Sequence, residues 1–240
     1  MAKSIVIIPT YNEIENIEDI IQTVFALPKP FSILVVDDNS PDGTADKVIE
    51  LQTQFPNQLF LEVRKKKSGL GTAYVHGFKW AIAKEFDYIF EMDADFSHNP
   101  NDLVHLQQVC EDGADLAIGS RYSTGVNVVN WPLSRVLLSY FASVYVRLIT
   151  GMKIHDATAG FKCYKRKVLE TINLDKIKFV GYAFQIEMKY RVFVKQFNIV
   201  EVPIIFTDRT KGQSKMSGAI IREAVFGVIL LRIKSLFNQL

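Results

Sequence analysis

The apolar residues of the first 125 positions follow two alternating patterns. Short apolar runs, rich in β-branched residues and each followed by a polar or glycine-containing segment, cover residues 4–8, 31–36, 59–63, 87–92 and 115–119. Between the runs, apolar residues recur at a spacing of three and four, as in residues 14–25, and this spacing predicts helices. Strands that alternate with helices predict a doubly wound, mostly parallel, twisted α/β sheet with helices on both faces.

The pattern changes after residue 130. Residues 133–150 and 218–237 predict two helices that are apolar on nearly all sides, interrupted by a few charges. Such a helix is buried in a core or lies against lipid. Because the core is already supplied by the strands and their helices, we expect a membrane-surface platform, with a dimer interface or core packing as alternatives. The interior charges, and the lack of about 18 uninterrupted apolar residues, argue against a membrane span.

The remaining segments of the second half continue the α/β pattern. Residues 162–165 and 199–206 predict strands, and residues 183–195 predict a helix. With 240 residues, 48% of them hydrophobic, the chain is long enough for one catalytic domain over residues 1–240. Its 28 basic and 26 acidic residues nearly balance, which disfavours nucleic acid as a partner.

The cysteines and the N-terminus both indicate the cytosolic side of a membrane. Cys110 and Cys163 match no metal or redox spacing, and we expect reduced thiols in the core. The chain enters its first strand within four residues and lacks the charged, apolar and small-residue succession of a signal peptide.

The candidate chemistry centres on Asp93 and Asp95, which follow the strand at 87–92. Two carboxylates at the carboxyl edge of a parallel sheet, where open α/β folds bind ligands, suit Mg²⁺ or Mn²⁺ shared with phosphate oxygens. The alternative is that they cap the next helix, whose start is marked by Asn99, Pro100 and Asn101. The spacing alone leaves both interpretations open.

Two further loops have a functional and a plain interpretation. The basic run at 64–67 is either a solvated surface or a neighbour of an anionic ligand. The polar loop at 207–215 either closes over a phosphate or is an exposed connection. A dinucleotide-binding fold is disfavoured, because Gly69-Leu70-Gly71 follows the third strand and no G-x-G-x-x-G follows the first.

With these residues in view, nearly the whole chain resembles the family 2 glycosyltransferases, and more closely the short form of the polyprenyl-phosphate (dolichyl-phosphate) mannose synthases, without a transmembrane domain. The resemblance rests on Pro9-Thr10-Tyr11-Asn12-Glu13, Val36-Asp37-Asp38-Asn39-Ser40-Pro41-Asp42-Gly43-Thr44, Gly69-Leu70-Gly71-Thr72-Ala73, Met92-Asp93-Ala94-Asp95, Gly119-Ser120-Arg121-Tyr122, Gly181-Tyr182-Ala183-Phe184-Gln185-Ile186-Glu187, and Arg209 followed by Gly212 and Ser214-Lys215. It implies the A-type nucleotide-sugar glycosyltransferase fold, with residues 1–125 for the donor and 126–240 for the acceptor and the membrane interface.

The resemblance also implies a role for each matching residue. The donor nucleotide sugar would contact Pro9, Tyr11, Glu13, Asp38, Asp93, Ala94 and Lys215. The Mg²⁺ or Mn²⁺ ion would bind Asp93, Asp95 and Ser97, although family members often carry Gln in place of Ser97. The acceptor phosphate would bind Arg121, Arg135 and Ser139, and catalysis would depend on Asp95, Arg121 and Arg209. Arg135 and Ser139 are four residues apart and share a helix face, as one phosphate would require. Lys162 stands where an arginine is expected.

The implied reaction is an inverting transfer of mannose from GDP-mannose to a polyprenyl monophosphate. The acceptor would need no general base, because a phosphate monoester with a second pKa of about 6 is already mostly dianionic at neutral pH. The alternative is another nucleotide sugar or a hydroxyl acceptor, for which Glu187 or Asp156 would be the base. A non-catalytic binding subunit and a soluble nucleotidyltransferase fit the residues less well. We expect a peripheral protein on the cytoplasmic face of a membrane, with a small membrane anchor subunit or a homodimer as further partners.

Overall fold

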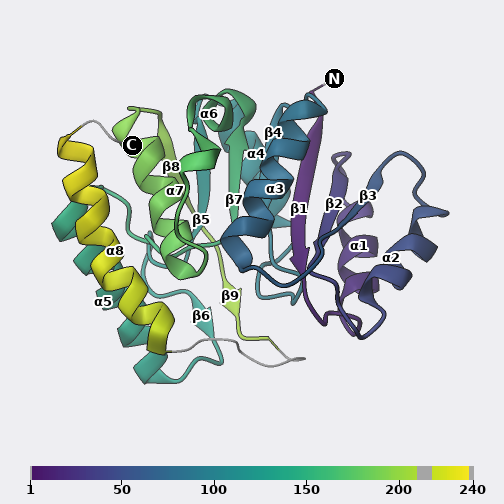
Figure 1. The fold of residues 1–240 in the computed structure, drawn as a ribbon, viewed down its shortest axis with the longest axis horizontal. Helices are drawn as coiled ribbons and strands as arrows, with labels where there is room; N and C mark the ends of the chain where they lie inside the picture. The colour runs from purple at the N-terminus through teal and green to yellow at the C-terminus, as the bar shows by residue number, and fades with distance from the viewer. Residues whose placement is uncertain (1, 210–217, 238–240) are drawn as a thin grey trace.

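The computed structural model describes residues 2–209 and 218–237. Its main element is an open seven-stranded sheet with the strand order β3-β2-β1-β4-β7-β5-β8 (Figure 1). The strands of this sheet are β1 (Ser4–Thr10), β2 (Ser32–Asp37), β3 (Leu59–Val63), β4 (Tyr88–Glu91), β5 (Leu116–Ser120), β7 (Lys162–Lys165) and β8 (Ile199–Pro203). The helices are α1 (Ile17–Phe25), α2 (Thr44–Gln52), α3 (Leu70–Ala83), α4 (Asp102–Glu111), α5 (Leu133–Thr150), α6 (Arg166–Thr171), the 3-10 turn η1 (Leu174–Lys176), α7 (Tyr182–Val194) and α8 (Gly218–Leu236).

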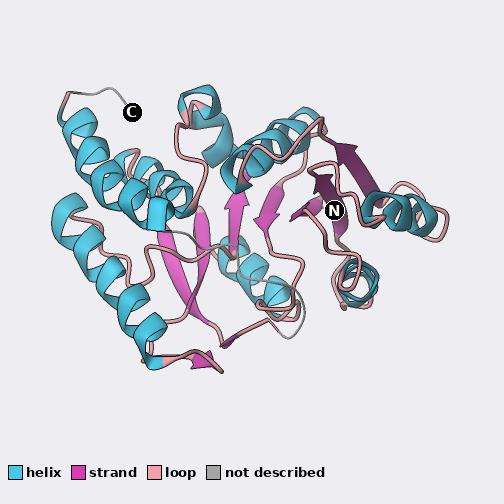
Figure 2. Cartoon of the chain, turned by 60° about the horizontal axis from the view of Figure 1, so that its bottom comes forward, coloured by secondary structure: helices cyan, strands magenta, loops and turns pink. Residues whose placement is uncertain are grey.

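The sheet separates two hydrophobic cores, one on each face (Figure 2). Along β1, Ile5 and Ile7 belong to one core, while Val6 and Ile8 belong to the other, as the alternation of side chains along a strand requires. Helices α1, α2 and α4 supply one core, and α3, α6 and α7 supply the other. Strands buried on both faces explain why these runs are apolar throughout.

The predicted mostly parallel α/β sheet is confirmed, with one exception in direction. Strand β7 is antiparallel and lies between β4 and β5, so that Cys163 pairs with Phe90 on one side and Ala117 on the other. Both cysteines are free and buried, as expected.

The expectation of one continuous strand over 199–206 is wrong. Strand β8 ends at Pro203, which has no N–H to donate to a sheet ladder. The chain then leaves the large sheet and forms β9 (Phe206–Thr207), which pairs in parallel with β6 (Val128–Val129). This break carries the following residues away from the large sheet and toward the N-terminal end of α5, where Arg135 lies.

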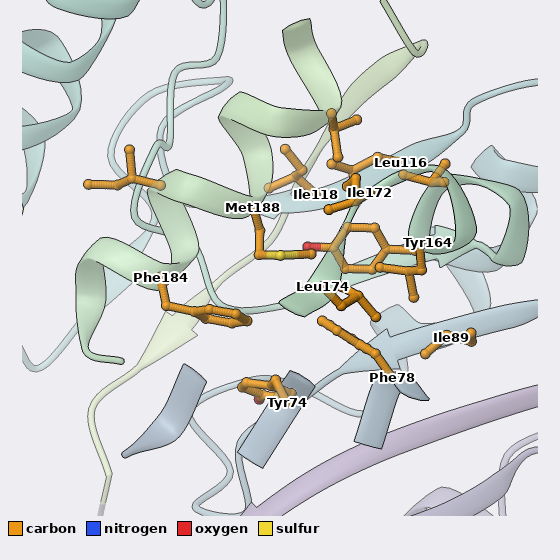
Figure 3. Close-up of a cluster of buried hydrophobic side chains, with 14 of the residues drawn as sticks. Tyr74, Phe78, Ile89, Leu116, Ile118, Tyr164, Ile172, Leu174, Phe184 and Met188 are labelled. Carbon is orange, nitrogen blue, oxygen red and sulfur yellow. The ribbon is translucent and has the colours of Figure 1, made fainter. Parts of the chain in front are cut away.

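Aromatic side chains fix α3 and α7 against the sheet (Figure 3). The rings of Tyr74 and Phe184 stack with 6.0 Å between their centroids, and Phe78 meets Tyr164 edge-on at 5.5 Å. Where α3 begins, an added Cβ on Gly71 would lie 2.7 Å from the carbonyl oxygen of Phe179. Only glycine therefore allows α3 to approach the segment before α7 so closely.

Helices α5 and α8 lie side by side beyond the β8 end of the sheet (Figures 1 and 2). The Tyr145 hydroxyl donates to the carbonyl oxygen of Val225, at 2.9 Å, which ties the two helices together. Only Ser143, Val146 and Thr150 of the 18 residues of α5 are buried. By length and composition α5 alone, within the part of the chain described, is apolar enough to cross a membrane. Plain core packing does not account for this helix, because half of its apolar residues are exposed.

Candidate active site

One cleft of about 720 Å³ opens at the carboxyl ends of β1, β4 and β5 and extends to α5 and α8. The structure brings together in it almost every residue that the sequence predicted. Its lining includes Pro9, Tyr11, Glu13, Asp38, Asp93, Ala94, Asp95, Ser97, Arg121, Arg135, Ser139 and Arg209. Lys215, also predicted, lies outside the described residues, as does most of the loop at 207–215. The roles of the individual residues remain predictions.

Where the cleft lies next to β1 and β2, basic side chains contact two of the residues that line it. Asp38 is paired with the guanidinium of Arg64, which also donates to the Thr72 hydroxyl at 2.7 Å. The ammonium of Lys67 lies 4.1 Å from the centre of the Tyr11 ring. The basic run at 64–67 is therefore not merely a solvated surface, because two of its residues contact predicted donor-binding side chains.

The carboxylate pair lies in the middle of the cleft. Asp95 is buried, and its Oδ1 accepts hydrogen bonds from the backbone N–H and the hydroxyl of Ser97. Its Oδ2 lies 2.9 Å from Nη2 of Arg209. Asp93 is 38% exposed; loss of surrounding water and the nearby charge of Asp95 raise its pKa to about 7. The cleft thus concentrates negative charge that a cation would relieve.

The helix-capping alternative for the two aspartates is wrong. Helix α4 has Asn101 as its N-cap, and the side chain of Asn99 accepts the hydrogen bond from the Asn101 N–H at 3.1 Å. Asp95 is instead turned toward Ser97 and Arg209.

The donor set fits a divalent cation that shares its coordination with a ligand. The structure shows no group of three or more His, Cys, Asp or Glu side chains able to hold a metal among the residues it describes. Asp93 and Asp95 therefore form an incomplete site. Mg²⁺ in proteins is often bound by one or two carboxylates, with the remaining positions taken by substrate phosphates and water. The hydroxyl hydrogen of Ser97 points to Asp95, so ligation by Ser97 would use its oxygen lone pair.

Two arginines also line the cleft, and each has a carboxylate partner. Arg121 donates to both oxygens of Asp156, from Nε at 2.7 Å and from Nη2 at 2.6 Å. Arg135 donates from Nη1 to Asp208 at 2.8 Å. The Trp131 ring lies near both guanidinium groups, with its centre 5.3 Å from Cζ of Arg121 and 4.1 Å from Cζ of Arg135. Both arginines and Ser139 line the same cleft.

The two candidate general bases are engaged elsewhere. Asp156 is fully buried; burial raises its pKa, but the charge and hydrogen bonds of Arg121 outweigh burial and leave it below the usual value. Glu187 is paired with Arg191 at 2.7 Å and accepts the backbone N–H groups of Lys178 and Phe179. Neither carboxylate lines the cleft. The structure therefore disfavours a hydroxyl acceptor that needs either of them as a base.

A buried polar network behind the cleft was not predicted. Lys162 pairs with Glu91 at 3.0 Å and hydrogen-bonds to Gln185, while Glu91 also accepts from the Tyr164 hydroxyl. Lys189, fully buried, donates to the carbonyl oxygens of residues 157 and 159, at 2.9 and 2.6 Å. The sequence held no distinct signal, because the strand at 162–165 has two lysines and the helix at 183–195 has four charged residues. Lys162 does not line the cleft, whereas Thr158, Ala159 and Gly160 of the segment before it do.

His98 is a second residue that sequence reasoning missed. Its ring lines the cleft, stacks on Phe161 with 4.9 Å between centroids, and accepts the Asp93 N–H through Nδ1 at 3.4 Å. Burial lowers its pKa to about 4, so the ring is neutral at neutral pH. Its position three residues after Asp95 was the only signal in the sequence.

The far end of the cleft is apolar and opens onto the surface. Leu138 and Phe141 on α5 and Val225 on α8 line the cleft and are also 44, 60 and 41% exposed. A ligand that fills the whole cleft therefore contacts carboxylates, two arginines and an open apolar surface.

Known structures share the fold of this chain. Glucosyl-3-phosphoglycerate synthase from Mycobacterium tuberculosis, solved with Mn²⁺, UDP and glucosyl-3-phosphoglycerate, matches with a TM-score of 0.71 at 18% identity, over 96% of this chain and 80% of that one. A mannosyltransferase from Pyrobaculum calidifontis, solved with GDP-Man and Mn²⁺, matches with a TM-score of 0.58 at 14% identity, over 99% of this chain and 72% of that one. The chain therefore has the α/β fold of nucleotide-sugar glycosyltransferases.

The sequence places the chain within a family. Residues 5–172 match the family model described as glycosyl transferase family 2, and the chain belongs to this family. It is 48% identical to a polyprenol monophosphomannose synthase of Mycolicibacterium smegmatis, over 94% of this chain and 85% of the relative. It is 44% identical to an undecaprenyl-phosphate mannosyltransferase of Micrococcus luteus, over 92% of this chain and 90% of the relative.

Proposed function

We propose that the chain transfers mannose from GDP-mannose to a polyprenyl monophosphate, with inversion at the anomeric carbon. Two relatives with 44 and 48% identity over more than nine tenths of the chain are named for the transfer of mannose to such lipids. The observation that carries the proposal is that one cleft is lined by carboxylates, by arginines and by an exposed apolar surface. A lipid phosphate combines charge and hydrocarbon in one molecule, as this lining requires.

The acceptor phosphate attacks without a general base. At neutral pH a phosphate monoester carries a charge of about −1.5 to −2, so its oxygen is already a nucleophile. Arg121 and Arg135 hold this oxygen near the sugar and offset the repulsion between two anionic substrates. Asp156 fixes the guanidinium plane of Arg121 through two hydrogen bonds, so that the group is oriented before the lipid arrives.

The leaving diphosphate is neutralised at the middle of the cleft. Asp93 and Asp95 would hold Mg²⁺ or Mn²⁺, which supplies Lewis-acid stabilisation of the departing GDP. Arg209, now 2.9 Å from Asp95, lies close enough to contribute a second positive charge. Asp38, held by Arg64, and Tyr11, under Lys67, are placed to contact the nucleoside.

The protein rests on the cytoplasmic face of a membrane through α5 and α8. Leu133, Phe141 and Leu148 on α5 and Phe226 on α8 are each at least 60% exposed. This face continues into the apolar end of the cleft, so an acceptor enters directly from the lipid layer. The test is co-sedimentation with vesicles of neutral and anionic lipids. Wild type should pellet and Leu148→Glu/Phe226→Glu should not; a double variant that pellets equally, or wild type that forms stable dimers and ignores vesicles, contradicts this placement.

A transfer assay tests the proposed reaction. Purified protein is incubated with Mg²⁺ or Mn²⁺, polyprenyl phosphate, and labelled GDP-mannose or UDP-glucose, and label is counted in the organic phase. We expect label only from GDP-mannose and only with metal, and none with Asp95→Ala. Consumption of either donor onto a soluble hydroxyl acceptor, with no label in the lipid, would leave only the family assignment standing.

A further inference from the structure

Arg135 has a protein anion as its partner in the same cleft where the acceptor phosphate is expected. Its Nη1 lies 2.8 Å from Oδ1 of Asp208, which also accepts the backbone N–H of Arg209 at 3.1 Å. The two side chains of the pair are 23 and 28% exposed, so the pair does not lie in the core, and Arg135 lines the cleft. A phosphate that binds Arg135 therefore meets a position already held by a carboxylate.

The backbone around Asp208 is fixed, so its carboxylate stays near Arg135. The Phe206 N–H donates to the carbonyl oxygen of Asn127, and the Asp208 N–H donates to that of Val129, both at 3.0 Å. On the other side, the Thr207 N–H donates to the carbonyl oxygen of Ser97 at 3.3 Å. A tethered carboxylate has a high effective concentration at its partner and returns whenever the partner is vacated.

We propose that Asp208 is a built-in competitor of the acceptor phosphate for Arg135, an inference that rests on the proposed function. A phosphate monoester offers Arg135 more charge and more acceptor oxygens than the carboxylate, and it replaces Asp208. An uncharged hydroxyl acceptor would break the ion pair between Arg135 and Asp208 without supplying a negative charge to Arg135. Its binding is therefore disfavoured. Asp208 therefore favours the binding of phosphate acceptors over uncharged acceptors at Arg135.

The same competition favours release of the product. Transfer of mannose converts the phosphate monoester into a diester, which carries a single negative charge. The diester bears the same cost of displacing Asp208 and has a weaker attraction to Arg135, so the carboxylate returns and the lipid leaves. An ordinary surface ion pair would contribute only to stability and would not change the affinity for phosphates.

Equilibrium binding tests the inference without any need for turnover. The ligand is geranyl phosphate, a short soluble isoprenyl monophosphate, and its uncharged control is geraniol; both are titrated calorimetrically into the whole protein. Because a partly exposed ion pair is a modest competitor, Asp208→Asn should bind geranyl phosphate about threefold to fivefold more tightly than wild type. Asp208→Glu, which keeps the charge, should bind like wild type. Geraniol binding should be equal in all three.

Two further variants separate competition from a general effect. Asp87→Asn removes an ion pair of similar exposure, with Arg166 at 3.4 Å and outside the cleft, and should leave the affinity unchanged. In an Arg135→Gln background, Asp208→Asn should no longer tighten binding, because the competed group is absent.

The inference is overturned if Asp208→Asn binds geranyl phosphate equally or more weakly, or if the tightening persists without Arg135. Wild type that does not bind this ligand overturns it as well. Wild type that binds the phosphate with the expected Asp208 dependence but transfers no mannose would contradict the proposed function and leave the role of Asp208 intact.

Discussion

Replacement of Asp156 by asparagine tests how the acceptor arginine is held. Asp156 has no exposed surface, and its two oxygens accept three hydrogen bonds from the side chain and backbone of Arg121, at 2.6 to 3.0 Å. Asparagine has the same shape as aspartate but carries no charge. Its NH₂ group would face the Arg121 guanidinium, which cannot accept a hydrogen bond. The variant therefore leaves a buried cation without its counter-charge.

The expected losses follow from burial of the pair. Removing one partner of a buried ion pair costs about 3–5 kcal/mol, and we expect about 3 kcal/mol for Asp156→Asn because the amide oxygen still accepts hydrogen bonds from Arg121. Displacement of the Arg121 guanidinium should lower kcat/KM for polyprenyl phosphate by about 10²-fold, since small misplacements at a reacting centre cost that much. The KM for GDP-mannose should change little.

Urea unfolding monitored by circular dichroism, together with initial rates, measures both quantities. Because the pKa of Asp156 is below its usual value in the folded protein, its charge stabilises the fold above the unfolded-state pKa, and this contribution is lost as pH falls through the folded value. The stability difference between wild type and Asp156→Asn should be constant from roughly pH 5 to 8 and shrink below roughly pH 4. A variant that keeps full stability but loses kcat would instead identify Asp156 as a general base and refute this reasoning.

Three further substitutions test the surroundings of the cleft. Lys189→Met leaves two buried carbonyl oxygens unpaired and should lower the free energy of unfolding by about 2 kcal/mol in urea titrations. An unchanged free energy of unfolding would mean that the loop at 156–160 keeps its structure without Lys189. Gly71→Ala should be destabilising by about 2 kcal/mol despite the helix preference for alanine, because the added Cβ would lie 2.7 Å from backbone. Gly160→Ala, with its nearest neighbour at 3.6 Å, is the matched control in the same melting experiment. Trp131→Ala should raise the KM for polyprenyl phosphate about threefold through loss of cation–π contact, and Trp131→Phe should restore most of it; equal kinetics for all three proteins would exclude a role for the ring.

The strands and helices of the first half were predictable because local and global preferences agree there. Ile5 to Ile8 form an apolar run that is buried on both faces, and polar residues follow each strand at the same sheet edge. Sequence patterns could not indicate that β7 runs antiparallel between β4 and β5, because a short strand has the same pattern in either direction. The break after Pro203 had a physical signal in the missing N–H, yet the apolar residues on both sides favoured one strand.

The candidate site was predictable as a set of residues but not as a set of partners. Motifs at the strand ends identified the residues that line the cleft. They could not indicate that Arg121 is paired with Asp156, 35 positions away, or that Arg135 is paired with Asp208, 73 positions away. Such pairs depend on how distant segments meet. The burial of Lys162 and Lys189 was not predicted, because lysine side chains in half-buried strands and helices usually lie at exposed positions.

The bond formed in the lipid product tests the central claim most directly. Product made from GDP-mannose and polyprenyl phosphate is purified and examined by phosphorus and proton nuclear magnetic resonance. The account predicts a phosphodiester whose phosphorus couples to the anomeric proton of mannose, with the configuration inverted relative to the donor. A product in which the phosphorus remains a monoester and mannose is attached to a hydroxyl group would contradict it.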